Sequence, residues 1–390
     1  MRRLLRWSVI LVAVGHGLIH LLGAVKGFGW AEVPALEQPI GPGLGICWLG
    51  AGALMLLTAG LLAARVEAWW TVAAAAVLAS QAVIITSWGD ARAGTVANGL
   101  LALAAVYGYA SHGRRSLRAT FHRDVDAALA ASRPSSAPVT EQDLDHLPTS
   151  VADYLRRCGA VGQPRVTSFR ATIHGRIRAG ATESWMSFTG EQVNTYGADP
   201  TRQFFIDATR SGLPVDVLHV FADGHASMRV KLCSLLRLVN AGGPDLDRAE
   251  TVTVFNDLCV LAPAALVDAP VLWQTLGSRQ VRGAFTLGGR TVTAELTFNG
   301  DHELVDFVSD DRLAGSADGR SFVAQRWSTP ISAYRDVGSR RAACYGEGHW
   351  HLPAPDGEFS YLEFHVDELR YNVESEGVGS AAAQRPAAVG

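Results

Sequence analysis

Four apolar runs in the first 111 residues constrain the fold of this chain more than any other feature. They cover about residues 4–25, 41–64, 68–88 and 95–110, and each is close to the length of a helix that crosses a bilayer. Three Arg side chains precede the first run, but no small-residue cleavage site follows it, so we expect an uncleaved span. The sequence therefore predicts a four-helix transmembrane bundle over residues 1–111.

Basic residues beside the apolar runs predict which side of the membrane carries the rest of the chain. They stand before the first run and after the fourth, at Arg2, Arg3, Arg6, Arg114, Arg115, Arg118 and Arg123. The loop over residues 26–39 has only one Lys and two Glu. Because Lys and Arg are enriched on the cytoplasmic side, we expect a multi-pass protein with both ends inside the cell.

Polar residues interrupt three of the apolar runs. His16 and His20 are four residues apart, which places them on one face of the first helix, while Gln81 and Asn98 fall in the third and fourth runs. Ionisable groups at this depth usually face the bundle interior, so we expect a polar cluster of these four residues. It fits a haem or metal ligand pair, a quinone site or a proton relay, and equally hydrogen bonds that fix helix packing. Because no Cys, Asp or Glu accompanies the two histidines as a third ligand, no metal site is predicted.

Residues 112–139 form a predicted amphipathic connector and linker. Apolar side chains recur at four-residue steps, at Leu117, Phe121, Val125 and Leu129. Arg118 and Arg123 lie between them, which is typical of a helix at the inner leaflet, and a continuation of the fourth span fits the pattern as well. We place a soluble domain at residues 140–374. The Gly- and Ala-rich residues 375–390 are expected to form a disordered tail.

From Val166 onward the hydrophobic period changes to two. Phe169, Ala171 and Ile173 alternate with polar residues, and similar runs follow to about Val373. Asp223-Gly224 and Asn299-Gly300 are strong hairpin signals. Consecutive hairpins without crossover helices predict an antiparallel sheet, either flat or curled around a helix.

One helix interrupts these hairpins, over residues 243–261. Pro244 follows Gly243 at its start, and Val254, Phe255, Leu258 and Leu261 fall on one side. Glu250, Thr253, Asn256 and Asp257 fall on the other, which predicts an amphipathic helix packed across the sheet. Glu250 and Asp257 share a face, so they are candidates for acid–base chemistry or members of a solvated surface.

Composition excludes several classes of function. The formal net charge is −3, which gives no indication of nucleic-acid binding. The five cysteines are scattered without a CxxC pair, so neither a disulfide framework nor a structural zinc site is expected. No phosphate-binding loop, dinucleotide fingerprint or nucleophile elbow is present.

The segment GPDLDRAETVTVFNDLCVLAPAALVD resembles part of a bacterial family of unknown function. Further similar positions are the start HGLIHLLGAVKGFG, Trp273, Asp311-Arg312, Trp327 with Pro330, Trp350, Glu358-Phe359 with Tyr361, and Tyr371-Asn372. Members of that family join N-terminal membrane helices to a soluble β domain. The resemblance implies a curved sheet like that of bacterial lipoprotein carriers, but no reaction and no catalytic residues. The apolar runs and the basic residues beside them predict a place in the bacterial inner membrane.

The sequence thus predicts an α+β membrane protein, with a transmembrane bundle followed by a curved antiparallel β domain. We expect it to bind a hydrophobic or lipid-like ligand, and membrane lipid is the expected partner. The candidate ligand-binding residues are Phe169, Trp185, Phe204, Glu250, Asp257 and Phe285. A filled core without a cavity is the alternative for the aromatic residues. Alternative functions are a membrane redox or transport component that uses His16 and His20, and an enzyme that uses Glu250 and Asp257. The sequence indicates no particular cofactor.

Overall fold

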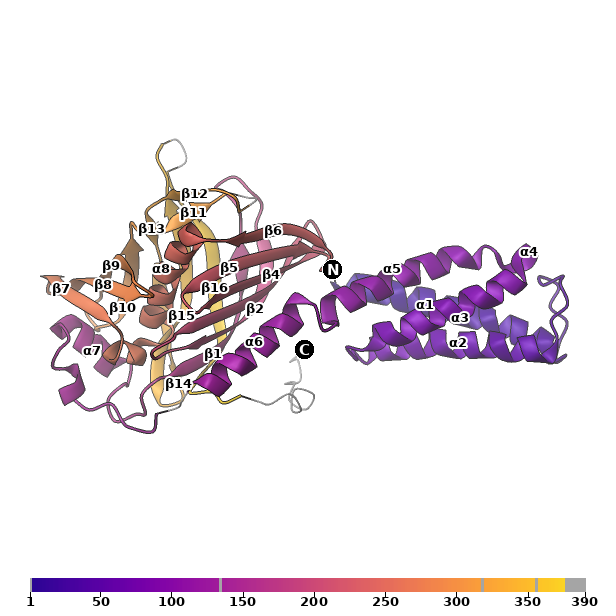
Figure 1. Ribbon diagram of the computed structural model, residues 1–390, viewed down its shortest axis with the longest axis horizontal. Coiled ribbons are helices and arrows are strands. Elements are labelled where there is room, and N and C mark those ends of the chain that lie inside the picture. The colour runs from indigo at the N-terminus through magenta and orange to yellow at the C-terminus, as the bar shows by residue number, and fades with distance from the viewer. Residues whose placement is uncertain (1, 133–134, 317–318, 355–356, 376–390) are drawn as a thin grey trace. The chain divides into compact units, whose positions relative to one another are not determined.

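The computed structural model describes residues 2–132, 135–316, 319–354 and 357–375. The chain divides into two compact units, a helical unit over residues 1–119 and a β unit over most of residues 120–390 (Figure 1). The predicted disordered tail falls largely on residues 376–390, which lie outside the described part.

The helical unit consists of long helices joined by short connections. They are α1 (Arg2–Gly27), α2 (Pro42–Ala63), α3 (Trp69–Thr86), the four-residue α4 (Trp88–Ala91) and α5 (Gly94–His112). Within the described residues, three segments are long and apolar enough to cross a membrane: residues 5–27, 42–63 and 69–86. The fourth predicted span is present as the helix α5, but it is not among them, because Asn98 and the polar residues near its end lower its hydropathy. The expectation of four spans is therefore reduced to three candidates.

Small residues let α1 and α2 approach closely. A Cβ atom at Gly27 would lie 2.6 Å from the Cα atom of Gly45, and one at Gly23 would overlap the indole of Trp48. Trp48 is consequently buried between the helices, with 2% of its surface exposed. Glycine at these positions is needed for close packing, as the backbones could not approach with a larger side chain.

The β unit contains two α-helices of its own besides α6. Its helical elements are α6 (Leu117–Ala131), a 3₁₀ turn (Gln142–Leu144), α7 (Thr149–Arg157), α8 (Pro244–Val260) and a second 3₁₀ turn (Pro263–Val267). The strands before α8 are β1 (Ser168–Ile177), β2 (Met186–Thr195), β3 (Thr201–Arg210), β4 (Leu213–Ala222), β5 (His225–Leu232) and β6 (Leu236–Gly242).

The strands after α8 include several short ones. They are β7 (Val271–Gly277), β8 (Gln280–Leu287), β9 (Arg290–Phe298), β10 (Leu304–Ser309), β11 (Leu313–Gly315), β12 (Phe322–Ala324), β13 (Trp327–Ser328), β14 (Ile331–Val337), β15 (Arg340–His351) and β16 (Glu358–Tyr371). The predicted turn at Asn299-Gly300 extends over five residues, because Asn299 Oδ1 accepts hydrogen bonds from the amides of Asp301 and Glu303.

Fourteen strands form one antiparallel sheet, as the hairpin pattern predicts. The order is β6-β5-β4-β3-β2-β1-β16-β15-β13-β10-β9-β8-β7, with β14 paired to β15, and β11 and β12 form a separate two-stranded sheet. The central β1–β16 pair joins the first and last strands of the unit. Between β4 and β5, Asp223 and Gly224 both have positive φ, as a tight hairpin turn requires.

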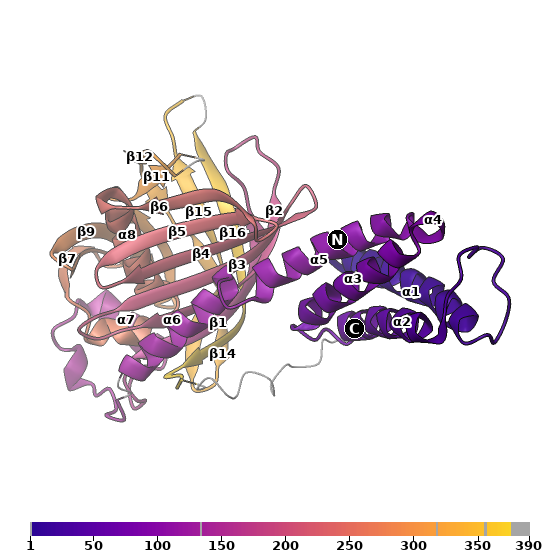
Figure 2. The ribbon, with the colours of Figure 1, turned by 45° about the vertical axis from the view of Figure 1, so that its right-hand side comes forward.

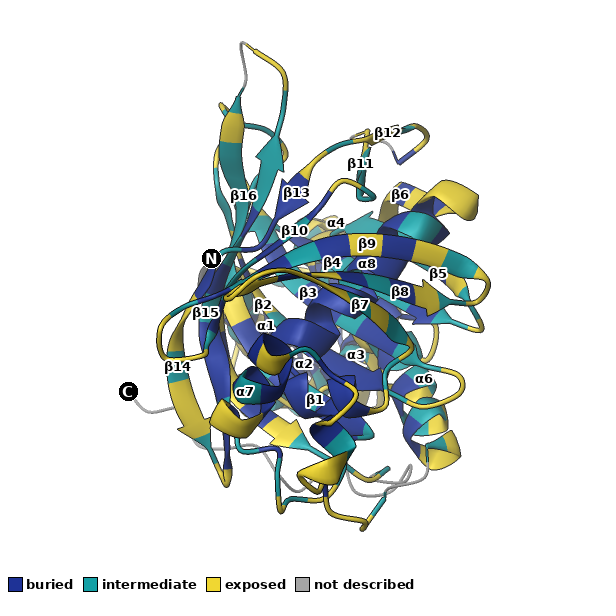
Figure 3. Cartoon of the chain, turned by 90° about the vertical axis from the view of Figure 1, so that its left-hand side faces the viewer, coloured by how far each residue is buried: buried dark blue, intermediate teal, exposed yellow. Residues whose placement is uncertain are grey.

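The sheet curls around α8 (Figure 3). The helix contacts β5 and β6 on one side and β9 and β10 on the other. As a result, 13 of its 17 residues are buried, including Glu250 and Asp257. The prediction of an amphipathic helix with one solvated side is therefore wrong, because the sheet encloses the helix instead of supporting it from one side.

Aromatic side chains fill the space between α8 and the second half of the sheet. Phe255 stacks on Phe285 with ring centroids 5.1 Å apart and meets the edge of Phe307 at 5.4 Å. From α7, the hydroxyl of Tyr154 donates to the carbonyl of Cys259 at 2.7 Å, which ties α7 to the end of α8. This side of α8 is a packed core.

Helix α6 lies across the outer face of the first half of the sheet (Figure 2). Its Phe121 is 1% exposed and lies 6.0 Å from Phe205 of β3, measured between ring centroids. Val125 and Leu129 of the same stripe are also buried. The interpretation that this stripe faces lipid, or continues the last span, is therefore wrong, since its apolar side chains pack on the sheet.

Candidate functional site

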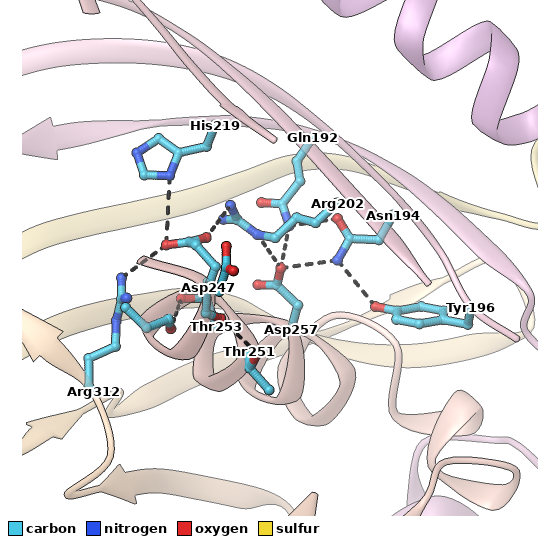
Figure 4. Close-up of polar contacts among 12 residues, drawn as sticks. Gln192, Asn194, Tyr196, Arg202, His219, Asp247, Thr251, Thr253, Asp257 and Arg312 are labelled. Carbon is cyan, nitrogen blue, oxygen red and sulfur yellow. Dashed lines mark hydrogen bonds and ion pairs between the residues drawn. The ribbon is translucent and has the colours of Figure 1, made fainter. Parts of the chain in front are cut away.

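A buried ion cluster lies between α8 and the first half of the sheet (Figure 4). Arg202 of β3 points toward the helix, and its Nε donates to Asp257 Oδ2 at 2.8 Å while its Nη1 donates to Glu250 Oε2 at 3.2 Å. The side chains of Arg202, Glu250 and Asp257 are 7%, 3% and 9% exposed. One guanidinium thus bridges two carboxylates seven residues apart on the helix.

Two amides of β2 complete the surroundings of Asp257. Gln192 Nε2 and Asn194 Nδ2 donate to the same Oδ2 atom at 2.6 and 3.0 Å. Asn194 also donates to the hydroxyl of Tyr196 at 3.4 Å. With Arg202, three donors converge on this oxygen, so Asp257 is held as a carboxylate anchor in the interior.

Glu250 interacts with a second group of residues. Arg312, which follows β10, donates from Nη2 to Glu250 Oε1 at 3.4 Å, and His219 Nδ1 of β4 lies 3.7 Å from the same oxygen. Burial alone would raise the pKa of Glu250, but the contact with His219 and the charges of Arg202 and Arg312 outweigh it. The pKa of Glu250 therefore lies well below its ordinary value, and this carboxyl is ionised at neutral pH.

Arg312 is only partly satisfied. Its guanidinium carbon lies 5.5 Å from the ring centroid of Trp327, and its side chain is 12% exposed. Its Nε is buried and, within the described structure, makes no hydrogen bond. An orphaned donor next to a charged cluster is unusual in a protein interior.

The strand register explains why charges and apolar residues lie side by side here. Inward-facing residues alternate along β3, so Arg202 is followed on the same face by Phe204 and Ile206. Phe204 pairs with His219 and Ile206 pairs with Val217 on β4. The inner face, the side of the sheet that faces α8, therefore changes from charged to apolar along each strand.

An apolar strip continues the inner face beyond the ion cluster. Its members are Phe204, Val217, Met228, Val230 and Leu232, on β3, β4 and β5. All five pack against the main core but remain partly exposed. The β11–β12 connection approaches β6, since a Cβ at Gly319 would lie 2.7 Å from Val239. We call the five residues Phe204, Val217, Met228, Val230 and Leu232 the inner strip.

Comparison with known proteins places this architecture in a family. Residues 137–364, more than half of the chain, match the "Family of unknown function (DUF6544)". The chain belongs to this family. No curated protein matches the sequence. The resemblance noted from the segment around α8 is thereby confirmed.

Two solved structures are similar to the β unit at low sequence identity. One is a domain assigned to outer membrane lipoprotein sorting from Vibrio parahaemolyticus, with 12% identity and a TM-score of 0.31, covering 53% of this chain and 85% of that one. The other is a DUF1329 family protein from Desulfovibrio piger ATCC 29098, with 11% identity and a TM-score of 0.31, covering 57% and 92%. Similarity at this level says nothing of what the DUF6544 domain binds.

Three of the six candidate ligand-binding residues meet at Arg202. Glu250 and Asp257 bind its guanidinium, and Phe204 lies under it, with the ring centroid 5.4 Å from the guanidinium carbon. Arg202 and the two amides of β2 were not among the residues expected at a site from the sequence. Their signal was a run of polar side chains at inward positions of strands that are otherwise apolar on that face.

The other three candidates lie elsewhere. Phe169 is fully buried beside Tyr196, and Phe285 is part of the packed core around Phe255. Trp185 precedes β2 and is held between two guanidinium groups, those of Arg176 and Arg178, at 4.6 and 4.5 Å. None of these three residues makes a hydrogen bond or ring contact with Arg202, Glu250 or Asp257 in the described structure.

The four polar residues expected in the helical unit are joined by hydrogen bonds. His16 Nε2 lies 3.1 Å from both Ser80 Oγ and Asn98 Oδ1, and His20 Nε2 lies 2.7 Å from Ser80 Oγ. Asn98 donates from Nδ2 to Gln81 Oε1 at 3.0 Å. Ser80, which the sequence analysis did not include in the cluster, connects the two histidines to α5.

The β-unit cluster gathers two carboxylates and their donors around Arg202. Glu250 is ionised, and Asp257 accepts three hydrogen bonds. Cys259 on the same helix is fully buried, which raises the pKa of its thiol and leaves it unreactive. The arrangement places a polar cluster at one end of an apolar surface.

Proposed function

We propose that the β unit binds an amphipathic, lipid-like ligand along the inner strip, with the ligand's polar group beside His219 and Arg312. The observation that carries the proposal is the juxtaposition of a partly exposed apolar strip with a buried ion cluster whose Arg312 Nε lacks a partner. Apolar side chains that face the interior of a curled sheet and still contact water favour an apolar occupant.

The two ends of the strip define the ligand's chemistry. Val230 and Leu232 at one end offer only apolar surface, which suits an acyl or similar hydrocarbon chain. At the other end, His219 is 20% exposed and Arg312 is 12% exposed, so donors are accessible to a carboxylate or phosphate-like group. We infer an anionic head group because both accessible side chains can donate and neither carries negative charge.

The helical unit is proposed to anchor the β unit in the bacterial inner membrane. Three segments are long and apolar enough to span a bilayer. The Arg residues at positions 114, 115, 118 and 123 favour a cytoplasmic location for the β unit, which requires α5 to cross as a fourth span. Membrane lipid is then the nearest source of an amphipathic ligand.

Lipid retention tests the binding proposal in the full chain. We would purify it in a mild detergent, wash it extensively and quantify the remaining lipids by mass spectrometry. In the variant Val217→Arg a charge occupies the inner strip, whereas in the matched control Val220→Arg a charge occupies the outer face of the same strand, β4. We expect a near-stoichiometric lipid species in wild type and Val220→Arg that Val217→Arg loses. No retained species, or equal retention in both variants, would overturn the proposal.

A membrane redox or transport role is a second candidate, favoured by one observation. Beside the histidine cluster, His20 Nδ1 and Trp48 Nε1 are buried without hydrogen-bond partners in the described structure, and their rings lie 5.1 Å apart. Two such groups fit a carbonyl-bearing cofactor such as a quinone. Trp48→Phe removes the N–H together with one ring of the indole, and the exposed Trp30→Phe, which makes the same change, is its control. Solvent extraction should recover a quinone from wild type and Trp30→Phe but not from Trp48→Phe; recovery from none would reject this role.

A further inference from the structure

The turns that connect β1 to β6, the first half of the sheet, lie at two opposite ends of these strands. In an antiparallel meander every second turn lies at the same end, so the β1–β2, β3–β4 and β5–β6 connections share one end. These connections cover residues 178–185, 211–212 and 233–235. The β2–β3 and β4–β5 connections, residues 196–200 and 223–224, lie at the opposite end.

Large apolar side chains are exposed at the first of these ends. Leu213 is 48% exposed, Leu236 is 63% exposed and Leu238 is 43% exposed. We call these three residues the leucine end. At the opposite end the exposed side chains include Asp199 and Asp223, and no large apolar residue is exposed within its described turns. The two ends of one meander therefore differ sharply in polarity.

Basic residues surround the leucine end. Arg210 and Arg237 are exposed next to Leu213 and Leu236, and Lys231 is partly exposed. In the β1–β2 connection, Trp185 lies between the guanidinium groups of Arg176 and Arg178. Glu183 is the one acidic residue of this connection. Exposed leucines, a tryptophan and several arginines together are typical of a surface that enters the head-group region of an anionic bilayer.

A short connection leads from the last helix of the helical unit to α6. Only residues 113–116 separate α5 from α6, and four residues span at most about 14 Å.

We propose that the leucine end inserts into the interface of an anionic lipid bilayer. The leucines enter the boundary between head groups and acyl chains, and Arg210, Arg237 and Lys231 bind lipid phosphates. This contact does not require a ligand on the inner strip, so either proposal can fail alone. If both hold, the end of the strip at Leu232 lies next to the turn that contacts lipid.

Fluorophore depth in reconstituted full-length protein tests this contact. Cys47 and Cys233 are first replaced by Ser, because the remaining cysteines are buried and the pKa of Cys158 is raised to about 12, mainly by burial. A polarity-sensitive fluorophore is then attached at Leu236→Cys or, as the control at the opposite end, at Asp199→Cys. Vesicles contain phosphatidylcholine with or without phosphatidylglycerol.

We expect lipids that carry a quencher in the bilayer to quench the Leu236 site at least threefold more than the Asp199 site. Iodide in the water should show the opposite order. In a second variant, Arg237→Glu, the Leu236 site should lose lipid quenching in phosphatidylglycerol vesicles and iodide quenching should rise. Equal iodide quenching at both sites would overturn the proposal, as would protection of the Leu236 site from iodide without lipid quenching, which would indicate a protein partner.

Discussion

Arg202 and Asp257 form an ion pair in the interior of the β unit, with 2.8 Å between Nε and Oδ2 and both side chains under 10% exposed. The pair joins β3 to the helix that the sheet encloses. Burying two charges costs desolvation that their attraction only roughly repays, so such pairs fix an arrangement more than they stabilise it. Here the pair sets the position of α8 against the charged end of the inner strip.

Removing the guanidinium should destabilise the β unit strongly. In Arg202→Met two carboxylates, Glu250 and Asp257, remain buried without their shared cation, and breaking a buried pair in this way costs about 3–5 kcal/mol. Thermal unfolding of the full chain, followed by far-UV circular dichroism in one detergent, measures the loss. Arg210→Met, at the exposed end of the same strand, should change the melting temperature little. A wild-type melting curve for Arg202→Met would contradict this account of the cluster.

Stability should fall in acid partly because of Glu250. Its pKa is depressed in the folded state and is about 4.3 in an unfolded chain. It therefore contributes stability that is fully present above pH about 4.3 and is lost as the pH falls further through the folded pKa. The melting temperature should decline between pH 5 and pH 3, and in Glu250→Gln the decline should be shallower although the protein is less stable at pH 7. Parallel curves for the two proteins would show that Glu250 does not titrate as described.

His349 should act with the opposite sign. Burial lowers its pKa, but hydrogen bonds with Glu347 and Glu358, at 2.9 and 2.8 Å, outweigh burial, so the pKa is raised overall. The stability it contributes is present below its unfolded pKa of about 6.5 and is lost as the pH rises through the folded value. His349→Gln should therefore lower the melting temperature at pH 5.5 more than at pH 9. An equal loss at both pH values would mean that only packing is affected.

The packing of α6 on the sheet predicts a further stability effect. Phe121 is almost fully buried, so Phe121→Ala should cost about 3–5 kcal/mol as the cavity remains partly open. The neighbouring His122 is exposed, and His122→Ala should be nearly neutral. Limited proteolysis near residues 131–139 should accelerate in the first variant only. If α6 faced lipid instead of the sheet, Phe121→Ala would leave both the melting temperature and the proteolysis rate unchanged.

Local patterns in the sequence were sufficient for an antiparallel sheet of consecutive hairpins. The period of two, the Asp223-Gly224 turn and the absence of crossover helices lead directly to an antiparallel meander, as the structure has it. The start of α8 at Pro244 also followed from sequence. These features depend on residues close together in the chain, which is why they could be inferred.

The ion cluster could not be inferred in the same way. Glu250 and Asp257 are buried only because strands from both halves of the sheet meet around α8, and that closure depends on the pairing of β1 with β16, about 200 residues apart. The stripe around Phe121 likewise has a pattern that suits lipid or a sheet equally well. An apolar face indicates that something covers it, and only the tertiary structure identifies the cover.

The most direct test of the central claim is to locate a lipid analogue on the chain. A fatty acid with a photoreactive diazirine in its acyl chain would be incorporated into vesicles that hold the full-length protein, crosslinked and mapped by peptide mass spectrometry. The account predicts crosslinks to peptides of β3–β5 that carry Phe204, Val217 and Met228, lost in Val217→Arg and kept in Val220→Arg. Crosslinks confined to the helices α1–α5, with none on these strands, would contradict it.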